Sequence, residues 1–367
     1  MTLADILRQH WPDYVVRSGG PAKIASAHWR AVEAVLSCGT SRLGGHVYRC
    51  KDCGRDHYGY HSCNHRSCPR CGARDQQVWA SRQQARLLPV PYFMITFTVP
   101  EAMRGFFLRH DKVAYKTLFA AASEATRDLF GNLRHFGGEP GFVAVLHTWT
   151  RQMLYHPHLH LVVPAVALAP GGCDVMRPAH PEYLLPHQPL ADRFRNRFLA
   201  ILRDRHPGLA ELIDAEVGRM RWNVNLQQVG SGKTAVRYLA AYVARSAFTE
   251  RRLDGYDDQG RIRLWWRDSS DGRSKLMKLE PHEFIRRWLL HVLPKGFTRV
   301  RHYGFLSAAA RKAFKRVRFL LGCGRLHIPD VPLVPVCCPH CEGPLERLRK
   351  IQPVRGPPLS AGLLHAT

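Results

Sequence analysis

The sequence has few acidic residues. Only 29 of its 367 residues are Asp or Glu, against 54 Lys and Arg, so the formal net charge is +25 and the pI is about 10.1. A chain this basic is expected to bind a polyanion. Apolar residues still make up 45% of the sequence, which is enough to form folded cores and excludes a wholly disordered basic chain.

Long apolar runs are also missing. No stretch reaches the roughly 18 apolar residues that a membrane span needs, and the best candidate, residues 159–169, is interrupted by Pro164. The first 14 residues carry Asp5, Arg8 and Asp13 where a signal peptide would be apolar. We therefore expect a cytoplasmic protein without membrane contacts, in which cysteines serve as thiols or metal ligands rather than disulfides.

Residues 38–75 contain few large aliphatic side chains but six of the 11 cysteines. Cys50-x2-Cys53 and Cys68-x2-Cys71 are separated by 14 residues, a spacing typical of two knuckles that share one Zn²⁺ ion. Such an ion can stabilise a segment that lacks a core by about 10 kcal/mol or more. Cys63 could replace Cys68 as a ligand, and the knuckles could grip DNA or serve structure alone.

A third Cys-x2-Cys pair lies near the C-terminus, at Cys338 and Cys341. Alone it is half of a zinc site. Cys323 and Cys337 are candidate partners that would complete a second site. The surrounding residues 326–367 are predicted to be a tail, and its Pro- and Gly-rich end from Arg355 is expected to be loose.

Between these segments the apolar pattern predicts a mixed domain of helices and strands. Expected strands cover 92–99, 142–149, 159–166 and 222–229, and expected helices cover 1–37, 111–130, 192–204 and 234–248. Two strands close in sequence predict an antiparallel hairpin, which favours an open α+β sheet over a TIM barrel. The predicted domains are residues 1–85 (helices and zinc-binding module), 90–255 (α+β core), 260–325 (basic region) and 326–367 (tail).

The segment His156-Pro157-His158-Leu159-His160 places histidines at alternate positions of a predicted strand. Because side chains alternate along a strand, His158 and His160 lie on the same face. Pro157 cannot donate to a sheet ladder and marks the strand's start, which favours this pair over His156 and His158. Two imidazoles about 7 Å apart at Cα can chelate one divalent ion. The alternative is two surface histidines on an edge strand.

Tyr238 and Tyr242 lie four residues apart on the predicted helix 234–248, so both phenols project from one helical face. Leu239 and Val243 can form the buried stripe of this helix one position round. The phenols are then free for chemistry, with Arg237 and Arg245 near them in sequence. Packing of both tyrosines in the core is the alternative.

Together the two motifs suit chemistry on a phosphodiester. A phenol is a poor nucleophile at its ordinary pKa of about 10, and a phosphodiester is a poor electrophile. A divalent ion would activate the phosphate, and a nearby cation would help the phenol. The phosphotyrosine product conserves the energy of the DNA linkage, and two tyrosines permit two successive cleavages. A zinc hydrolase built on His158 and His160 would need repeated βα units and further ligands, which the sequence lacks.

Several basic residues are candidate DNA contacts. Gly230-Ser231-Gly232-Lys233-Thr234 resembles a nucleotide-binding P-loop, but Gln227 stands where that motif requires Gly. We therefore expect this helix start to bind a DNA phosphate. Residues 281–325 carry 11 Lys and Arg and one carboxylate, which favours DNA contact over a merely solvated helix face. The residues expected to contact DNA are Lys233, Arg237, Arg245, Arg286, Arg287, Lys295, Arg299 and Arg301.

The order of these motifs resembles the HUH-type transposases of bacterial insertion sequences, in particular the two-tyrosine rolling-circle family typified by insertion sequence ninety-one. The matching segments run from about residue 38 to 322 and cover most of the chain. They are residues 38–46, 50–71, 146–149, 156–160, 238–245 and 284–304.

This resemblance implies a zinc-ribbon-like N-terminal module, an HUH nuclease core with a ferredoxin-like antiparallel sheet, and a basic helical C-terminal region. It implies that His158 and His160 bind Mg²⁺ or Mn²⁺ and that Tyr238 and Tyr242 are the nucleophiles. HUH sites usually take a third polar ligand. His147 is the first choice for it, ahead of Gln152 and Gln228.

The resemblance further implies cleavage of single-stranded DNA at element ends, 5′-phosphotyrosine intermediates and transfer of the strand to a target. The protein would be bacterial and associated with the nucleoid. Two alternatives remain open from the residues themselves. One is a zinc protein that binds DNA without catalysis, and the other is a plasmid-type relaxase or replication initiator, which shares the chemistry but serves different DNA.

Overall fold

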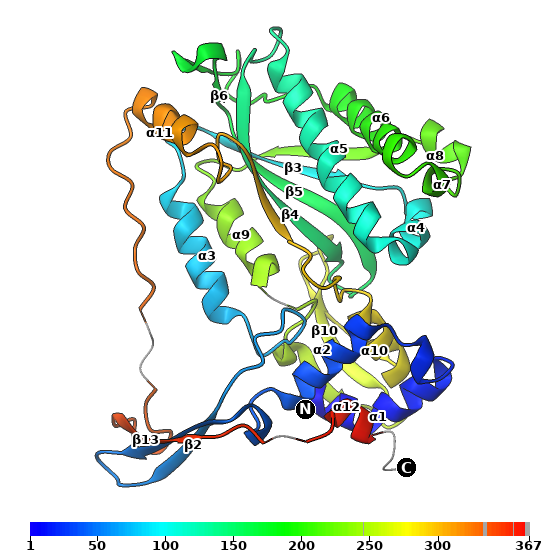
Figure 1. Ribbon diagram of the computed structural model, residues 1–367, viewed down its shortest axis with the longest axis vertical. Helices are drawn as coiled ribbons and strands as arrows, with labels where there is room; N and C mark the ends of the chain where they lie inside the picture. The colour runs from blue at the N-terminus through cyan, green and yellow to red at the C-terminus, as the bar shows by residue number, and fades with distance from the viewer. Residues whose placement is uncertain (245, 333–335, 355, 364–367) are drawn as a thin grey trace.

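The computed structural model describes residues 1–244, 246–332, 336–354 and 356–363. Its centre is an antiparallel sheet with the strand order β12, β4, β5, β3, β8 (Figure 1). The strands are β3 (Tyr92–Thr98), β4 (Glu139–Trp149), β5 (Tyr155–Pro164), β8 (Asn223–Gln228) and β12 (Val300–Gly304). Two short strands, β6 (Ala167–Leu168) and β7 (Val175–Met176), pair beside the start of β4.

The chain connects this sheet in the ferredoxin-like order β3, α5, β4, β5, α6, β8. Helices α5 (Asp111–Gly131) and α6 (His187–Arg205) lie on one face of the sheet with α4 (Arg104–Arg109), and α7 (Pro207–Ala210) and α8 (Ala215–Arg219) follow. Phe97, Phe119 and Phe194 are buried in the core between helices and sheet. The predicted α+β fold with a ferredoxin-like sheet and a β4–β5 hairpin is thus confirmed.

The opposite face is covered by α3 (Ala73–Ala85) and α9 (Lys233–Ala244), which pack against each other (Figure 1). Val145 and Val162 of the sheet form a core with Leu239 of α9, while Ala144 and Leu161 belong to the core under α5. This alternation sets which side chains of β4 and β5 face α9. None of the helices in the described residues combines the length and apolar character needed to cross a membrane.

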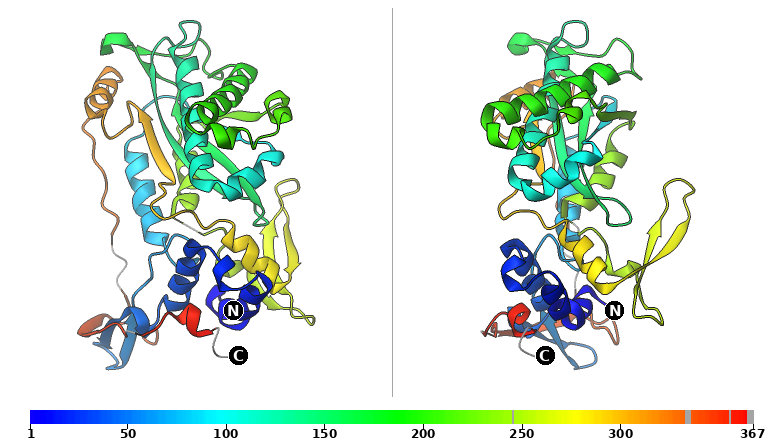
Figure 2. Two further views of the ribbon diagram at one scale, coloured as in Figure 1. Left: turned by 45° about the vertical axis from the view of Figure 1, so that its right-hand side comes forward. Right: turned by 90° about the vertical axis from the view of Figure 1, so that its right-hand side faces the viewer.

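A second folded part, which we call the second body, lies at one end of the sheet and joins the first helices of the chain to residues 253–289 (Figure 2). It contains α1 (Leu3–Arg17), α2 (Ser26–Ser37), α10 (Pro281–Leu289) and the three-stranded sheet β9 (Leu253–Tyr256), β10 (Ile262–Arg267) and β11 (Ser274–Leu279). Thr2 and Asp5 cap α1 reciprocally. Trp11 of α1 shares one core with Phe284 and Trp288 of α10. This core therefore crosses the boundaries predicted at residues 85 and 260.

The third sheet also joins distant segments. Its central strand β1 (Gly45–Cys50) pairs with β2 (Asp56–Tyr60) on one side and with β13 (Leu345–Ile351) on the other. Residues 321–332, which follow α11 (Arg311–Leu320), run beside α3 (Figure 1), where the Pro329 and Val331 carbonyls accept hydrogen bonds from Ser81 and Arg74. The final helix α12 (Leu359–Gly362) packs on α2. Residues 345–351 of the predicted tail thus form a strand of this sheet.

Candidate active site and metal centres

Three histidines converge on the α9 side of the central sheet. We call His147 of β4 and His158 and His160 of β5 the histidine cluster. The Nδ1 atom of His147 lies 2.9 Å from Nε2 of His158, which lies 3.1 Å from Nε2 of His160. The antiparallel register pairs His147 directly with His158, and the two-residue step along β5 puts His160 on the same face.

Hydrogen bonds hold the rings of His158 and His160 in position. Nδ1 of His158 donates to the carbonyl of His156 at 2.7 Å, which leaves Nε2 as a lone-pair donor for a metal. Nδ1 of His160 lies 3.0 Å from the hydroxyl of Thr96 on β3. Burial lowers the pKa of His158 to about 3 and that of His160 to about 4, and it lowers the pKa of His147 as well. The imidazoles are therefore neutral at physiological pH.

The histidine cluster fits a divalent ion. Three nitrogen ligands at about 2.1 Å from one ion, arranged at right angles, lie about 3.0 Å apart, close to the two measured separations. The hydrogen bond from Nδ1 of His158 to a backbone carbonyl is of the kind that orients metal-binding imidazoles in other proteins. Nε2 of His147 is buried and has no hydrogen-bond partner among the described residues. Gln228 instead donates to the carbonyl of Pro181, and Gln152 lies in the β4–β5 turn.

The loop before α9 sets the position of this helix. Tyr92 of β3 exchanges backbone hydrogen bonds with Val229 and Gly230, both at 2.8 Å. Gly232 has a φ of 79°, and a Cβ atom there would lie 2.8 Å from the Tyr92 ring, so only glycine fits. Lys233, the first residue of α9, is exposed. The P-loop-like sequence is thus a tight strand-to-helix turn whose lysine faces solvent.

The two tyrosines of α9 lie against the histidine cluster. The ring centre of Tyr242 lies 4.0 Å from that of His147, and the ring centre of Tyr238 lies 5.9 Å from that of His160. The two phenol rings are 4.9 Å apart. Tyr238 is 41% exposed, whereas burial and a hydrogen bond with Tyr238 raise the pKa of Tyr242. Both tyrosines therefore line the same site as the three histidines.

A cavity of about 190 Å³ opens beside this site. It is lined by His147, Tyr242 and two arginines, Arg151 of the β4–β5 turn and Arg252. Arg252 donates to the carbonyl of Arg151 at 2.6 Å, and burial lowers its pKa to about 10, so it stays charged at neutral pH. Neither arginine was predicted from the sequence, because Arg151 lies in the β4–β5 turn and Arg252 follows α9, and no motif links these two segments. The cavity is suited to an anionic group next to the tyrosines.

Arg299 is buried and contacts both α9 and β4 next to the site. It is 6% exposed, its guanidinium donates to the carbonyl of Tyr242 at 2.6 Å, and it lies 5.3 Å from the ring centre of Trp149. Burial lowers the pKa of Arg299 to about 10, so its charge persists. The prediction that Arg299 contacts DNA from the surface is therefore corrected, because this side chain holds the end of α9 against β4.

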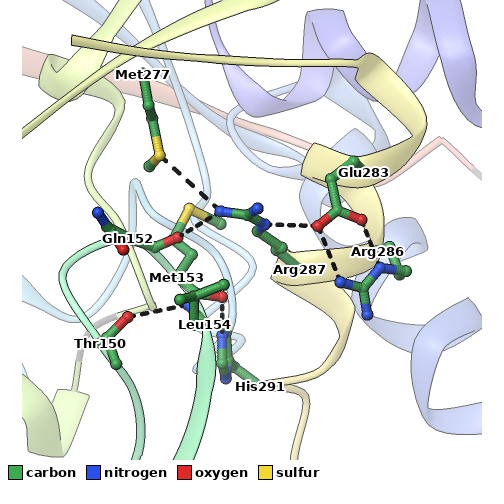
Figure 3. A network of polar contacts seen from close by, with 9 residues as sticks. All are labelled: Thr150, Gln152, Met153, Leu154, Met277, Glu283, Arg286, Arg287 and His291. Carbon is green, nitrogen blue, oxygen red and sulfur yellow. Dashed lines mark hydrogen bonds and ion pairs between the residues drawn. The ribbon is translucent and has the colours of Figure 1, made fainter.

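Arg287 likewise serves the fold. It pairs with Glu283 at 2.7 Å and donates to the carbonyl of Gln152 at 3.0 Å, while Arg286 pairs with the other oxygen of Glu283 at 2.6 Å (Figure 3). The side chain of Arg287 is only 17% exposed, against 44% for Arg286. Arg287 thus ties α10 to the β4–β5 turn, which corrects its expected role as a DNA contact, while Arg286 reaches solvent.

The remaining predicted DNA contacts divide between two faces. Lys233 and Arg237 on α9 and Lys295 before β12 are exposed. Arg301 lies over the Phe119 ring at 4.0 Å, on the α5 face of the sheet opposite the tyrosines, so it belongs to a different surface from the site. Arg245 lies outside the described residues.

The cysteines form two clusters, and the membership of both differs from the prediction. Cys38, Cys63, Cys68 and Cys71 form what we call the inner cysteine cluster, and Cys50, Cys53, Cys338 and Cys341 form the terminal cysteine cluster. The prediction that Cys50, Cys53, Cys68 and Cys71 share one ion is therefore wrong. Strand β1 pairs with β13 and carries the first knuckle away from the second.

Other details of the cysteine prediction change accordingly. Cys63 joins Cys68 in the inner cluster instead of replacing it, and Cys323 and Cys337 lie outside both clusters. Cys38 was missed because it stands alone, without the two-residue spacing of a knuckle. Within the inner cluster the Sγ atom of Cys71 lies 3.5 Å from that of Cys38 and 3.6 Å from that of Cys63.

The inner cluster joins the second body to the rest of the chain. The loop that carries Cys63 and Cys68 accepts a hydrogen bond at the Ser67 carbonyl from Trp288 of α10 at 3.0 Å. Arg66 donates to the carbonyl of Phe297 at 2.6 Å. A cavity of about 510 Å³ lies between this loop, α3 and residues 296–302. The cysteine-rich loop is thus held beside the segment that carries Arg299.

Comparison with known proteins agrees with this architecture. A family model described as "Transposase zinc-binding domain" matches residues 6–99, and one described as "Putative transposase" matches residues 141–313. The chain is 36% identical to "Putative transposase y4qJ" of Sinorhizobium fredii, over 87% of this chain and 84% of that protein.

A second relative is the transposase for insertion sequence element IS801 of Pseudomonas savastanoi pv. phaseolicola, which is 26% identical over 75% of this chain and 69% of its own length. No solved structure matches the chain. The family models cover both the cysteine-rich segment and the segment with the histidines and tyrosines. The chain therefore belongs to the IS91-type family of insertion-sequence transposases.

Proposed function

We propose that this transposase cleaves single-stranded DNA at the ends of its element, with Tyr238 and Tyr242 as nucleophiles. The cleaved strand is then transferred to a target by a rolling-circle mechanism. The observation that carries the proposal is the meeting of two phenols and three imidazoles, from α9 and the β4–β5 hairpin, around one point. Structural tyrosines would have no reason to face a set of convergent, neutral imidazole lone pairs.

The histidine cluster would hold the metal ion, Mg²⁺ or Mn²⁺. When bound, such an ion polarises the scissile phosphate and offsets the negative charge that develops on it. The histidines supply three neutral nitrogens, and Thr96 and the His156 carbonyl keep their rings in place. Arg151 and Arg252 line the adjoining cavity, where they can pair with a neighbouring phosphate.

In the cleavage step the phenolic oxygen of one tyrosine attacks the phosphorus, and the bond from phosphorus to the 3′ oxygen breaks. The tyrosine keeps the 5′ phosphate, and the proton lost by the phenol balances the one gained by the departing 3′ hydroxyl. The bond count is conserved, so a 3′ hydroxyl can later reverse the step and join a different strand. Since both tyrosines reach the site, a second strand can be cleaved before the first is released.

The raised pKa of Tyr242 distinguishes the two nucleophiles. This phenol is more buried than Tyr238 and pairs with it, so it resists ionisation until a phosphate and its cations enter the site. Tyr238 is accessible in the free protein. We infer that the tyrosines serve distinct steps, with Tyr238 exposed to the incoming strand and Tyr242 held against His147.

A covalent-adduct assay tests the proposal. Single-stranded oligonucleotides from the DNA that flanks the gene are labelled at the 5′ or 3′ end, incubated with Mg²⁺ or Mn²⁺, and run on a denaturing gel. The 3′ label should migrate with the protein, because the tyrosine holds the 5′ phosphate of the downstream fragment. Tyr238→Phe and Tyr242→Phe should each block a different transfer product, and the double variant should form no adduct.

Two results would contradict the proposal. An adduct formed by the double Phe variant would show that neither phenol is the nucleophile. Binding of the same oligonucleotides without any cleavage by the wild type would favour a zinc protein that binds DNA without catalysis. A relaxase or replication initiator would give the same adduct, but both relatives compared above are named as transposases.

A further inference from the structure

The geometry points to a second zinc ion, held by the terminal cysteine cluster, that ties the two ends of the chain together. Two of its four ligands, Cys338 and Cys341, lie outside the N-terminal zinc-binding domain. This inference goes beyond the proposed function, since it concerns how the molecule is held together. It rests on sulfur positions, backbone conformation and strand pairing.

The four sulfur atoms stand at the separations of a metal site. Sγ of Cys50 lies 3.4 Å from that of Cys341, and Sγ of Cys53 lies 3.7 Å from that of Cys338. In a tetrahedron with zinc–sulfur bonds of about 2.3 Å, neighbouring sulfurs are about 3.8 Å apart. A disulfide would require about 2.05 Å. An all-sulfur tetrahedral set of this kind is typical of zinc or an iron–sulfur centre.

The terminal pair has the same backbone conformation as the other two knuckles. The residue after the second cysteine has a positive φ in each: 71° at Gly54, 85° at Gly72 and 58° at Glu342. Glycine adopts this conformation freely, but a glutamate there costs free energy that the surrounding structure must offset. Metal binding would offset it. The Cys338–Cys341 segment is therefore shaped as a knuckle although it lacks the usual glycine.

Hydrogen bonds to sulfur support the same assignment. The backbone amide of Cys53 points to Sγ of Cys50 at 3.5 Å, and that of His340 points to Sγ of Cys338 at 3.5 Å. Nε2 of His57 on β2 lies 3.3 Å from Sγ of Cys338. Donors gathered around sulfur stabilise thiolates, which are the form that binds zinc.

The terminal cysteine cluster lies where β1, near residue 50, pairs with β13, near residue 345. Strand β1 ends at Cys50 and pairs with β13, whose first residue, Leu345, lies opposite Cys50. The amide of Lys51 donates to the Pro344 carbonyl at 3.0 Å, so the two knuckles are joined by backbone bonds as well as by sulfur. Most of β13 is exposed and buries little apolar surface. An ion here would supply stability that the strand does not obtain from a core.

Metal counting on the full chain tests the inference. Purified wild-type protein should contain two zinc ions per chain. Cys338→Ser/Cys341→Ser and Cys50→Ser/Cys53→Ser should each contain one, and the variant with all four changes should still contain one. The matched control Cys173→Ser/Cys323→Ser changes two cysteines outside both clusters and should keep two zinc ions.

Hydrogen exchange adds a readout that zinc counting does not give. Amides of β13 (Leu345–Ile351) should lose protection in both double variants, by at least about 10-fold in exchange rate, and should keep it in the control. The same effect from changes 285 positions apart would show one shared ion. One zinc ion in the wild type, or two in the Cys338→Ser/Cys341→Ser variant, would overturn the inference.

X-ray absorption at the zinc edge requires only the wild-type protein, so it tests the inference even if a variant fails to fold. The wild-type protein should show an average of four sulfur ligands per zinc at about 2.3 Å. A mean shell with nitrogen or oxygen replacing about half of the sulfur would overturn the assignment. Bound iron with the charge-transfer colour of an iron–sulfur centre would overturn it too.

Discussion

The histidine cluster and the terminal cysteine cluster differ in how far apart their ligands lie along the chain. The histidines come from two adjacent strands, and the antiparallel pairing of β4 with β5 places His147 opposite His158. The cysteines come from opposite ends of the sequence, and Cys53 and Cys338 are 285 residues apart. A rigid hairpin buried between two layers of helices can preorganise a site, whereas the exposed ribbon would obtain its cohesion from the zinc ion that we infer there.

The largest effect that separates the two regions should come from the histidine cluster. His158→Ala removes the central ligand and should lower metal-dependent cleavage at least about 100-fold, because a bound ion contributes several kcal/mol to phosphoryl transfer. Zinc content should stay at two ions per chain, and affinity for single-stranded DNA should stay within about 2-fold of wild type. Adduct yield, zinc counting and filter binding measure the three quantities. Full cleavage activity in this variant, or in EDTA with zinc retained, would contradict the role of the cluster.

The next largest effect should be a loss of folding stability in acid, caused by His291, a buried histidine outside the histidine cluster. Burial lowers the pKa of His291 to about 4, and its ring bridges the Met153 carbonyl at 3.1 Å and the Thr148 hydroxyl at 3.3 Å. A group whose pKa is lower in the folded state contributes stability at high pH and loses it as the pH falls from about 6.5 toward 4.

Thermal unfolding of the protein without added Mg²⁺ should therefore show a melting temperature that declines from pH 7 to pH 5. His291→Gln keeps hydrogen-bonding capacity without the titration and should flatten part of that decline. Zinc content measured at each pH separates this effect from loss of thiolate ligands. A melting temperature that rises on acidification would contradict the assignment of a neutral buried imidazole.

The sequence predicted that the three histidines group together because the information for this grouping is local. The two-residue spacing of His158 and His160 and the four-residue spacing of the tyrosines each fix a common face within one element. His147 followed from the preceding strand. The cysteine partners could not be derived in this way, since spacing within a knuckle does not reveal which distant knuckle completes the tetrahedron. Nor does sequence show that Arg299 turns inward to the end of α9.

The contact between the two bodies offers a matched pair of variants. Arg287→Ala breaks a partly buried ion pair and leaves the Gln152 carbonyl without its donor, so it should destabilise the protein by about 1–3 kcal/mol. Arg286→Ala removes a more exposed partner of the same Glu283 and should cost about 0–1 kcal/mol. Urea unfolding followed by fluorescence measures both. Equal losses would mean that the link from α10 to the β4–β5 turn adds nothing.

The smallest effect should come from the loss of a single surface cation. This experiment identifies which face of the sheet binds DNA. Lys233 is exposed at the start of α9, the helix that carries the tyrosines, whereas Arg301 lies over Phe119 on the opposite face of the sheet. Lys233→Ala should weaken binding of single-stranded DNA by about 10-fold or less and reduce the slope of log affinity against log salt by about 1, since one phosphate contact is lost. Arg301→Ala should leave that slope unchanged. The reverse pattern would place the DNA on the α5 face, away from the tyrosines, and would separate binding from the chemistry assigned to the histidine cluster.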